Sequence, residues 1–135
     1  AESHEAARAS LRRGEVAVMG GTLPGHTTDA VAALLAEMVG ADLLVYATSV
    51  PGVFSADPNA DSGAERYDAL SAGELVDVIS SIETAAGSNA PVDLLATKII
   101  ERSGLRAVVL DGSEPSRIAD AVAGDADGTE VRPDE

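Results

Sequence analysis

The apolar run at residues 42–48 is the feature that most limits the folds open to this 135-residue chain. Its centre reads Leu-Leu-Val-Tyr-Ala, without a polar residue. A strand with one face in solvent alternates polar and apolar residues, so an unbroken run predicts a strand that is buried on both faces. Such strands occur in parallel sheets covered by helices on both sides. We therefore expect an α/β fold.

The sequence around this run alternates between strand and helix patterns. Apolar runs predict two further strands and one short strand, at 15–19, 107–110 and 129–131. Caps and helical spacing predict helices at 2–13, 28–39, 71–81, 91–103 and 113–123. The long connection between the run and the third helix suits a functional loop or lid. The alternation predicts a mainly parallel sheet, and three good strands make it narrow, as in a piece of a larger domain.

Acidic residues dominate the charged positions. Asp plus Glu number 23 against 9 Lys plus Arg, and the formal charge of −14 disfavours nucleic acid and anionic membranes as partners. A carboxylate-rich surface with few aromatics fits adaptation to high salt. Lys98 is the only lysine, which suits either a retained function or a chance surface position. No cysteine, long apolar run or secretory signal is present, so a cytoplasmic location is expected.

The segment 20–29 carries the clearest site signal. It reads Gly-Gly-Thr-Leu-Pro-Gly-His-Thr-Thr-Asp and lies between a predicted strand and a predicted helix, where parallel sheets place ligands. Glycines permit close backbone approach, and a helix N-terminus binds phosphate. The segment matches neither the P-loop nor the dinucleotide-binding fingerprint. From the residues alone, a phosphate cradle and a plain glycine turn before a capped helix both stay open.

Four blocks together carry a resemblance. They are residues 18–33 with the glycine loop and its helix, 41–58 with the apolar strand and its following loop, 90–104 with the lysine-bearing helix, and 128–131. In order and spacing they resemble archaeal-type uridylate (UMP) kinases of the amino acid kinase family. The resemblance implies a three-layer α/β/α sandwich with a mainly parallel sheet. It also implies that residues 1–135 are the C-terminal part of a single domain, incomplete at the N-terminus, with an acidic tail at 124–135.

The resemblance also implies roles. ATP would phosphorylate UMP to UDP, with Mg²⁺ held through the nucleotide phosphates. Asp29 would organise the catalytic centre, and Lys98 would neutralise charge on the transferring phosphoryl group. The UMP site would comprise Thr22, Leu23, Pro24, Gly25, His26, Thr27 and Thr28. The ATP site would comprise Thr48, Ser49, Phe54 and Asp57.

The chain departs from the family in two places. Relatives read Thr-Asn-Val-Asp-Gly-Val-Tyr where residues 48–54 read Thr-Ser-Val-Pro-Gly-Val-Phe, which changes the ATP side. The family's N-terminal portion with its Gly-Gly-Ser phosphate loop is absent, so this chain alone is expected to be inactive. Relatives are hexamers, so a homo-oligomer is expected at full length. The alternatives are a non-catalytic nucleotide-binding regulatory module, or a sister phosphotransferase acting on an isoprenoid phosphate or an amino acid.

Overall fold

The computed structural model describes residues 3–20, 27–59, 61–84 and 90–133. Its helices and strands are, in chain order, α1 (His4–Arg12), α2 (Thr28–Val39), β1 (Leu44–Thr48), β2 (Ala69–Ser71), α3 (Ala72–Thr84), α4 (Leu94–Ser103), β3 (Ala107–Asp111), α5 (Ser116–Val122) and β4 (Gly128–Arg132). The strands form one sheet in the order β1-β3-β4-β2. β1 is parallel to β3 and β2 is parallel to β4, whereas β3 and β4 are antiparallel. The sheet is therefore mixed, with two of three pairings parallel.

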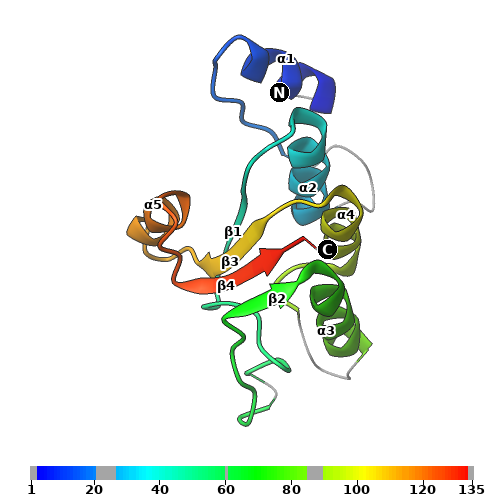
Figure 1. The fold of residues 1–135 in the computed structure, drawn as a ribbon, viewed down its shortest axis with the longest axis vertical. Coiled ribbons are helices and arrows are strands. Elements are labelled where there is room, and N and C mark those ends of the chain that lie inside the picture. Colours follow the sequence, from blue (N-terminus) through cyan, green and yellow to red (C-terminus); the bar gives the residue numbers. More distant parts are fainter. Residues whose placement is uncertain (1–2, 21–26, 60, 85–89, 134–135) are drawn as a thin grey trace.

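Helices cover both faces of this sheet, which confirms the α/β/α layers (Figure 1). α2, α3 and α4 lie on one face and α5 on the other. Because side chains alternate along a strand, Val109 of β3 joins the larger core under α2–α4, while Val108 joins the smaller cluster under α5. Both valines are buried. The apolar run at 42–48 behaves in the same way, with Tyr46 in the larger core and Val45 against the smaller cluster.

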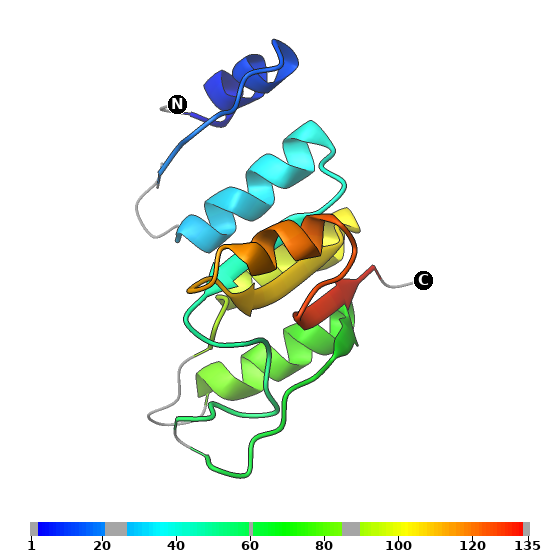
Figure 2. The same ribbon diagram turned by 90° about the vertical axis from the view of Figure 1, so that its left-hand side faces the viewer.

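α1 lies outside the three layers, against α2 (Figure 2). Its Ala7 is fully buried, and the Nε2 of His4 lies 3.1 Å from the carbonyl oxygen of Val31. The remaining side chains of α1 are half-buried or exposed. α1 therefore extends the layer made by α2 without reaching the sheet.

Helix caps follow the sequence closely. Thr27 caps α2, with its Oγ1 accepting a hydrogen bond from the N–H of Ala30 at 3.2 Å. Ser71 and Glu74 form the predicted capping box: the N–H of Ser71 donates to Glu74 at 2.9 Å, and the N–H of Glu74 donates to Ser71 at 3.1 Å. α2 ends at Val39 and is followed by Gly40, which has a left-handed φ of 65°. These predicted helix starts and stops are confirmed.

One predicted strand and two predicted helix starts are wrong. Residues 15–20 form no strand in the described chain, and Val16 and Val18 are 90% and 77% exposed. An apolar pattern cannot make a strand without a neighbour to complete the ladder, and β1 at the sheet edge pairs with β3 alone among the described strands. The helix predicted to start at Pro91 starts at Leu94 instead, because Asp93 is its cap. The helix predicted to start at Ser113 starts at Ser116.

The C-terminal segment contributes to the sheet. Residues 128–132, within the acidic tail at 124–135, form β4, which confirms the short strand predicted at 129–131 and lies between β3 and β2. Thr129 and Val131 of this strand are buried. β2 was not predicted, because three residues with one buried apolar side chain give no recognisable pattern. None of the helices in the described part of the chain is long and apolar enough to cross a membrane.

Candidate functional site

A cavity of about 310 Å³ lies where the chain leaves β1. The four residues predicted to bind ATP all line it: Thr48, Ser49, Phe54 and Asp57. Ile82 of α3 and Pro91, just before α4, line it as well. Its volume falls in the range of small-molecule sites. The structure therefore brings the predicted ATP residues together around one hollow of suitable size.

Polar side chains shape the mouth of this cavity. The hydroxyl of Thr48 accepts a hydrogen bond from the N–H of Val50 at 3.1 Å and lies 2.9 Å from the carbonyl oxygen of the same residue. Asp57 is only 4% exposed, and its carboxylate accepts from the N–H of Asn59 at 2.9 Å. Ser49 is exposed. Thr48 and Asp57 therefore fix two turns of the lining, and Ser49 is an exposed member of it.

A buried threonine of β4 holds the loop that surrounds the cavity. Thr129 is fully buried, and its Oγ1 accepts from the N–H of Val53 at 2.9 Å and donates to the carbonyl of Tyr67 at 2.5 Å. One hydroxyl thus joins the start and the end of the loop to the sheet. A Cβ at position 52 would lie 2.6 Å from that oxygen, so the close approach of the loop requires Gly52.

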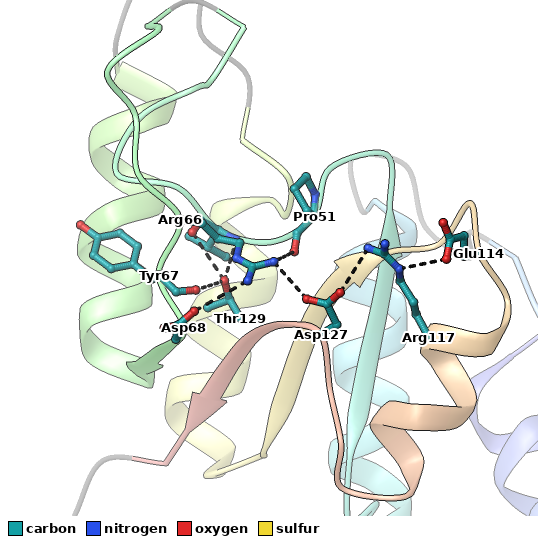
Figure 3. A network of polar contacts seen from close by, with 9 residues as sticks. Pro51, Arg66, Tyr67, Asp68, Glu114, Arg117, Asp127 and Thr129 are labelled. Carbon is teal, nitrogen blue, oxygen red and sulfur yellow. Dashed lines mark hydrogen bonds and ion pairs between the residues drawn. The ribbon is translucent and has the colours of Figure 1, made fainter.

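A chain of ion pairs supports the same loop from outside (Figure 3). Arg66 donates to the carbonyl of Pro51 at 3.5 Å and to Asp127 at 3.3 Å. Arg117 of α5 lies 3.7 Å from Asp127 and 3.5 Å from Glu114. Exposed pairs of this kind contribute at most about 1 kcal/mol each. They connect the loop to α5, but the buried hydroxyl contributes more to its position.

A second cluster joins the N-termini of α2 and α4. Thr27 caps α2 and Asp93 caps α4, accepting from the N–H of Ala96 at 2.7 Å. The Thr27 hydroxyl donates to the other carboxylate oxygen of Asp93. The N–H of Asp93 in turn donates to the carboxylate of Asp29 at 3.3 Å. The positive ends of two helix dipoles therefore meet beside Asp29.

Burial governs the electrostatics of this cluster. Desolvation raises the pKa of Asp29; the nearby charge of Asp93 adds to this, and the hydrogen bond from the Asp93 N–H opposes it. The Tyr46 hydroxyl donates to the carbonyl oxygen of Asp29 at 2.7 Å. Burial, together with the Asp29 and Asp93 charges, raises the pKa of Tyr46, so this phenol stays a neutral donor. Asp29 is therefore a half-buried carboxylate with fixed neighbours.

Lys98 is not part of this cluster. It is exposed on α4, whereas Ala96, Ile99 and Ile100 on the opposite side of that helix are buried. No hydrogen bond or ion pair joins the Lys98 side chain to another residue that the structure describes. Its predicted role stays a prediction.

The predicted UMP residues are only partly described. Thr27 and Thr28 open α2 and are exposed. The other predicted members of this site lie outside the described residues: Thr22, Leu23, Pro24, Gly25 and His26. The described part of the predicted UMP site is therefore the start of α2 and its cap.

Sequence reasoning missed Asp93 and Tyr46. Asp93 had a recognisable signal, since aspartate before an apolar helical pattern is a favoured cap. With the helix predicted to start at Pro91, Asp93 falls inside the helix and is not predicted as its cap. Tyr46 lies in the apolar run and is one of only two tyrosines in the chain. Its contact with Asp29 joins residues 17 positions apart and leaves no local pattern.

Comparison with known proteins agrees with this architecture. Residues 2–111 match the amino acid kinase family. A uridylate kinase of Natronomonas pharaonis is 81% identical over 135 residues, which are 100% of this chain and 60% of that protein. A uridylate kinase of Halobacterium salinarum is 64% identical over 99% of this chain and 56% of its own length. The matched stretches cover the residues of both clusters described above.

The crystal structure of the uridylate kinase from Archaeoglobus fulgidus has the same fold. It matches with a TM-score of 0.86 and 47% identity, over 97% of this chain and 58% of that chain. This chain spans only 56% to 60% of the length of these three proteins. The fold, the family match and the identities agree along nearly all of the chain. The chain belongs to the amino acid kinase family.

Proposed function

We propose that this chain is part of a uridylate kinase, which transfers the γ-phosphoryl group of ATP to UMP and forms UDP. One observation carries the proposal. Pro91 lines the 310 Å³ cavity beside the predicted ATP residues, and Asp93, two residues later, contacts Thr27 and Asp29 at the start of α2. One short segment therefore joins a nucleotide-sized cavity to the helix start predicted to receive the acceptor.

The cavity suits the donor nucleotide. We assign ATP to it, with Thr48, Ser49, Phe54 and Asp57 as its contacts. The Phe54 ring is half-buried in the wall and offers an apolar surface to a base. The Mg²⁺ ion is part of the substrate, because this metal is commonly held through nucleotide phosphates. No three His, Cys, Asp or Glu side chains converge into a metal-binding group among the described residues.

The start of α2 suits the phosphate of the acceptor. The unpaired N–H groups and the positive dipole end of a helix attract an anion, and here the N-terminus of α4 lies beside that of α2. We assign the phosphate of UMP to Thr27 and Thr28, together with residues 22–26. Phosphoryl transfer depends on positioning and charge stabilisation, which two converging helix N-termini supply.

Asp29 organises this arrangement in our proposal. Its carboxylate lies at the junction of the two helices, where it can orient the acceptor and the groups around it. Lys98 remains the predicted cation for the transferring group. The proposal also includes assembly into a homo-oligomer in the cytoplasm. The formal charge of −14 supports the absence of a nucleic-acid partner.

Tests of activity and binding need a longer chain than this one. We define the completed kinase as the Natronomonas pharaonis uridylate kinase in which residues 1–135 replace the matching 60%. Identity of 81% across the replaced segment keeps its contacts with the remaining portion close to their original form.

Ala56→Phe in the completed kinase is expected to weaken ATP binding at least 10-fold, about 1.4 kcal/mol. Ala56 lines the cavity, so a phenyl ring at this position fills space that the nucleotide needs. Ala64→Phe is the matched control, because Ala64 is also half-buried in the same connection but does not line the cavity. Calorimetric titration should show unchanged UMP binding in both variants. Unchanged ATP affinity in Ala56→Phe would remove ATP from this cavity.

A further inference from the structure

The backbone and the carboxylate of Asp29 are both held by residues with no assigned role. Resting on the proposed function, we propose that Tyr46 and Asp93 are positioning residues that fix Asp29 from two separate elements. Tyr46 holds the carbonyl group of Asp29 from β1. Asp93 holds its carboxylate from the start of α4. The two contacts come from opposite ends of the same residue, so together they fix its position and its orientation.

Tyr46 connects Asp29 to the ATP side of the site. It is 6% exposed within the larger core, and its hydroxyl lies 2.7 Å from the Asp29 carbonyl oxygen. A buried phenol needs an acceptor, so this bond determines how closely α2 approaches β1. Two residues farther along β1, Thr48 reaches the ATP cavity. One rigid strand therefore carries both the hydroxyl that holds Asp29 and part of the ATP lining.

The backbone N–H of Asp93 bonds to Asp29, while the side chain of Asp93 bonds to Ala96 and Thr27. One carboxylate oxygen of Asp93 accepts from the N–H of Ala96 and the other from the hydroxyl of Thr27. These two bonds fix the peptide of Asp93, whose N–H then donates to Asp29. The side chain of Asp93 therefore acts on Asp29 through a peptide group that it orients.

The charge of Asp93 also reaches Asp29. Among the described residues, the titratable groups that face Asp29 from the packed elements are Asp93 from α4 and Tyr46 from β1. The negative charge of Asp93 raises the pKa of Asp29, a smaller contribution than that of burial. Removing this charge leaves burial in place and lowers the pKa of Asp29 from its raised position. A change in pH dependence is therefore a signature of this contact that loss of packing alone does not give.

Tyr46→Phe in the completed kinase tests the first contact. The change deletes one hydroxyl and keeps the ring in the core, so the fold is retained while the start of α2 is freed. We expect kcat to fall roughly 10-fold, because small misplacements at a transfer site are costly. KM for both nucleotides should stay within about twofold. Tyr67→Phe is the matched control, since the Tyr67 hydroxyl bonds to no described residue, and its kcat should not change.

Asp93→Asn tests the second contact. Asparagine caps a helix as well as aspartate does, so α4 is kept while the charge and one acceptor are lost. We expect a similar fall in kcat and an acid limb of the kcat–pH profile that moves to lower pH. Wild-type kcat in Tyr46→Phe, or an unmoved acid limb in Asp93→Asn, would overturn the positioning role. A wild-type completed kinase that leaves UMP unphosphorylated would instead overturn the proposed function beneath it.

Discussion

Replacing Asp29 by asparagine in the completed kinase is expected to lower kcat roughly 100-fold while it stabilises the fold. The amide keeps the size of the side chain and can still accept from the N–H of Asp93, which lies 3.3 Å from the carboxylate. It loses the charge that we propose to organise the transfer. Because burial disfavours the ionised carboxylate, the neutral amide removes an unfavourable group from the folded state at neutral pH.

The stability effect has a defined pH dependence. A raised pKa in the folded state gives Asp29 a stabilising contribution that is fully present below the ordinary aspartate pKa and is lost as the pH rises through the raised value. The Tm of Asp29→Asn should therefore exceed that of the unsubstituted completed kinase at pH 7. This difference in Tm should shrink as the pH falls. Asp120→Asn, at an exposed position of α5, is the control for charge removal. A kcat within twofold of wild type in Asp29→Asn would contradict its catalytic assignment.

Thr129→Val is expected to lower the free energy of unfolding by about 2–4 kcal/mol. Valine keeps the shape of this fully buried side chain but leaves the N–H of Val53 and the carbonyl of Tyr67 without their partner. Burial of unpaired polar groups is costly. The loop around the ATP cavity should loosen as well, so ATP affinity in the completed kinase should fall with stability.

Thr97→Val provides a matched control for this change. Thr97 is equally buried, but its hydroxyl donates to the carbonyl of Leu94, which also accepts the regular helix bond from the N–H of Lys98. No backbone group loses its only partner, and the expected cost is below about 1 kcal/mol. Urea titrations of the completed kinase at constant salt measure the free energy of unfolding of both variants. Equal losses of this free energy would show that the Thr129 hydroxyl has no special role in holding the loop.

Local chemistry made most helices predictable from sequence. The capping box at Ser71 and the glycine after Val39 act within one helical turn, so their patterns are readable without a fold. Strands depend on partners elsewhere in the chain. β2 exists because Ala69–Ser71 lies beside Glu130–Arg132, and the segment 15–20 forms no strand although its apolar pattern predicts one.

In the candidate site, too, the residues that are close in sequence were predictable and those that are far apart were not. Thr48, Ser49, Phe54 and Asp57 lie within ten residues of one another, and the structure gathers all four around one cavity. The cluster around Asp29 joins residues 17 to 66 positions apart, so no spacing in the sequence predicted it. Composition and family resemblance single out Lys98, but neither of them specifies a helix face.

UDP formation from ATP and UMP by the completed kinase is the measurement that tests the central claim most directly. We predict equal amounts of ADP and UDP, a clear preference for UMP over CMP, AMP and GMP, and no turnover by the 135-residue chain alone. Transfer to an isoprenoid phosphate or an amino acid with UMP untouched would instead identify a sister phosphotransferase. Binding of both nucleotides without any transfer would identify a regulatory module, and either result would contradict the account.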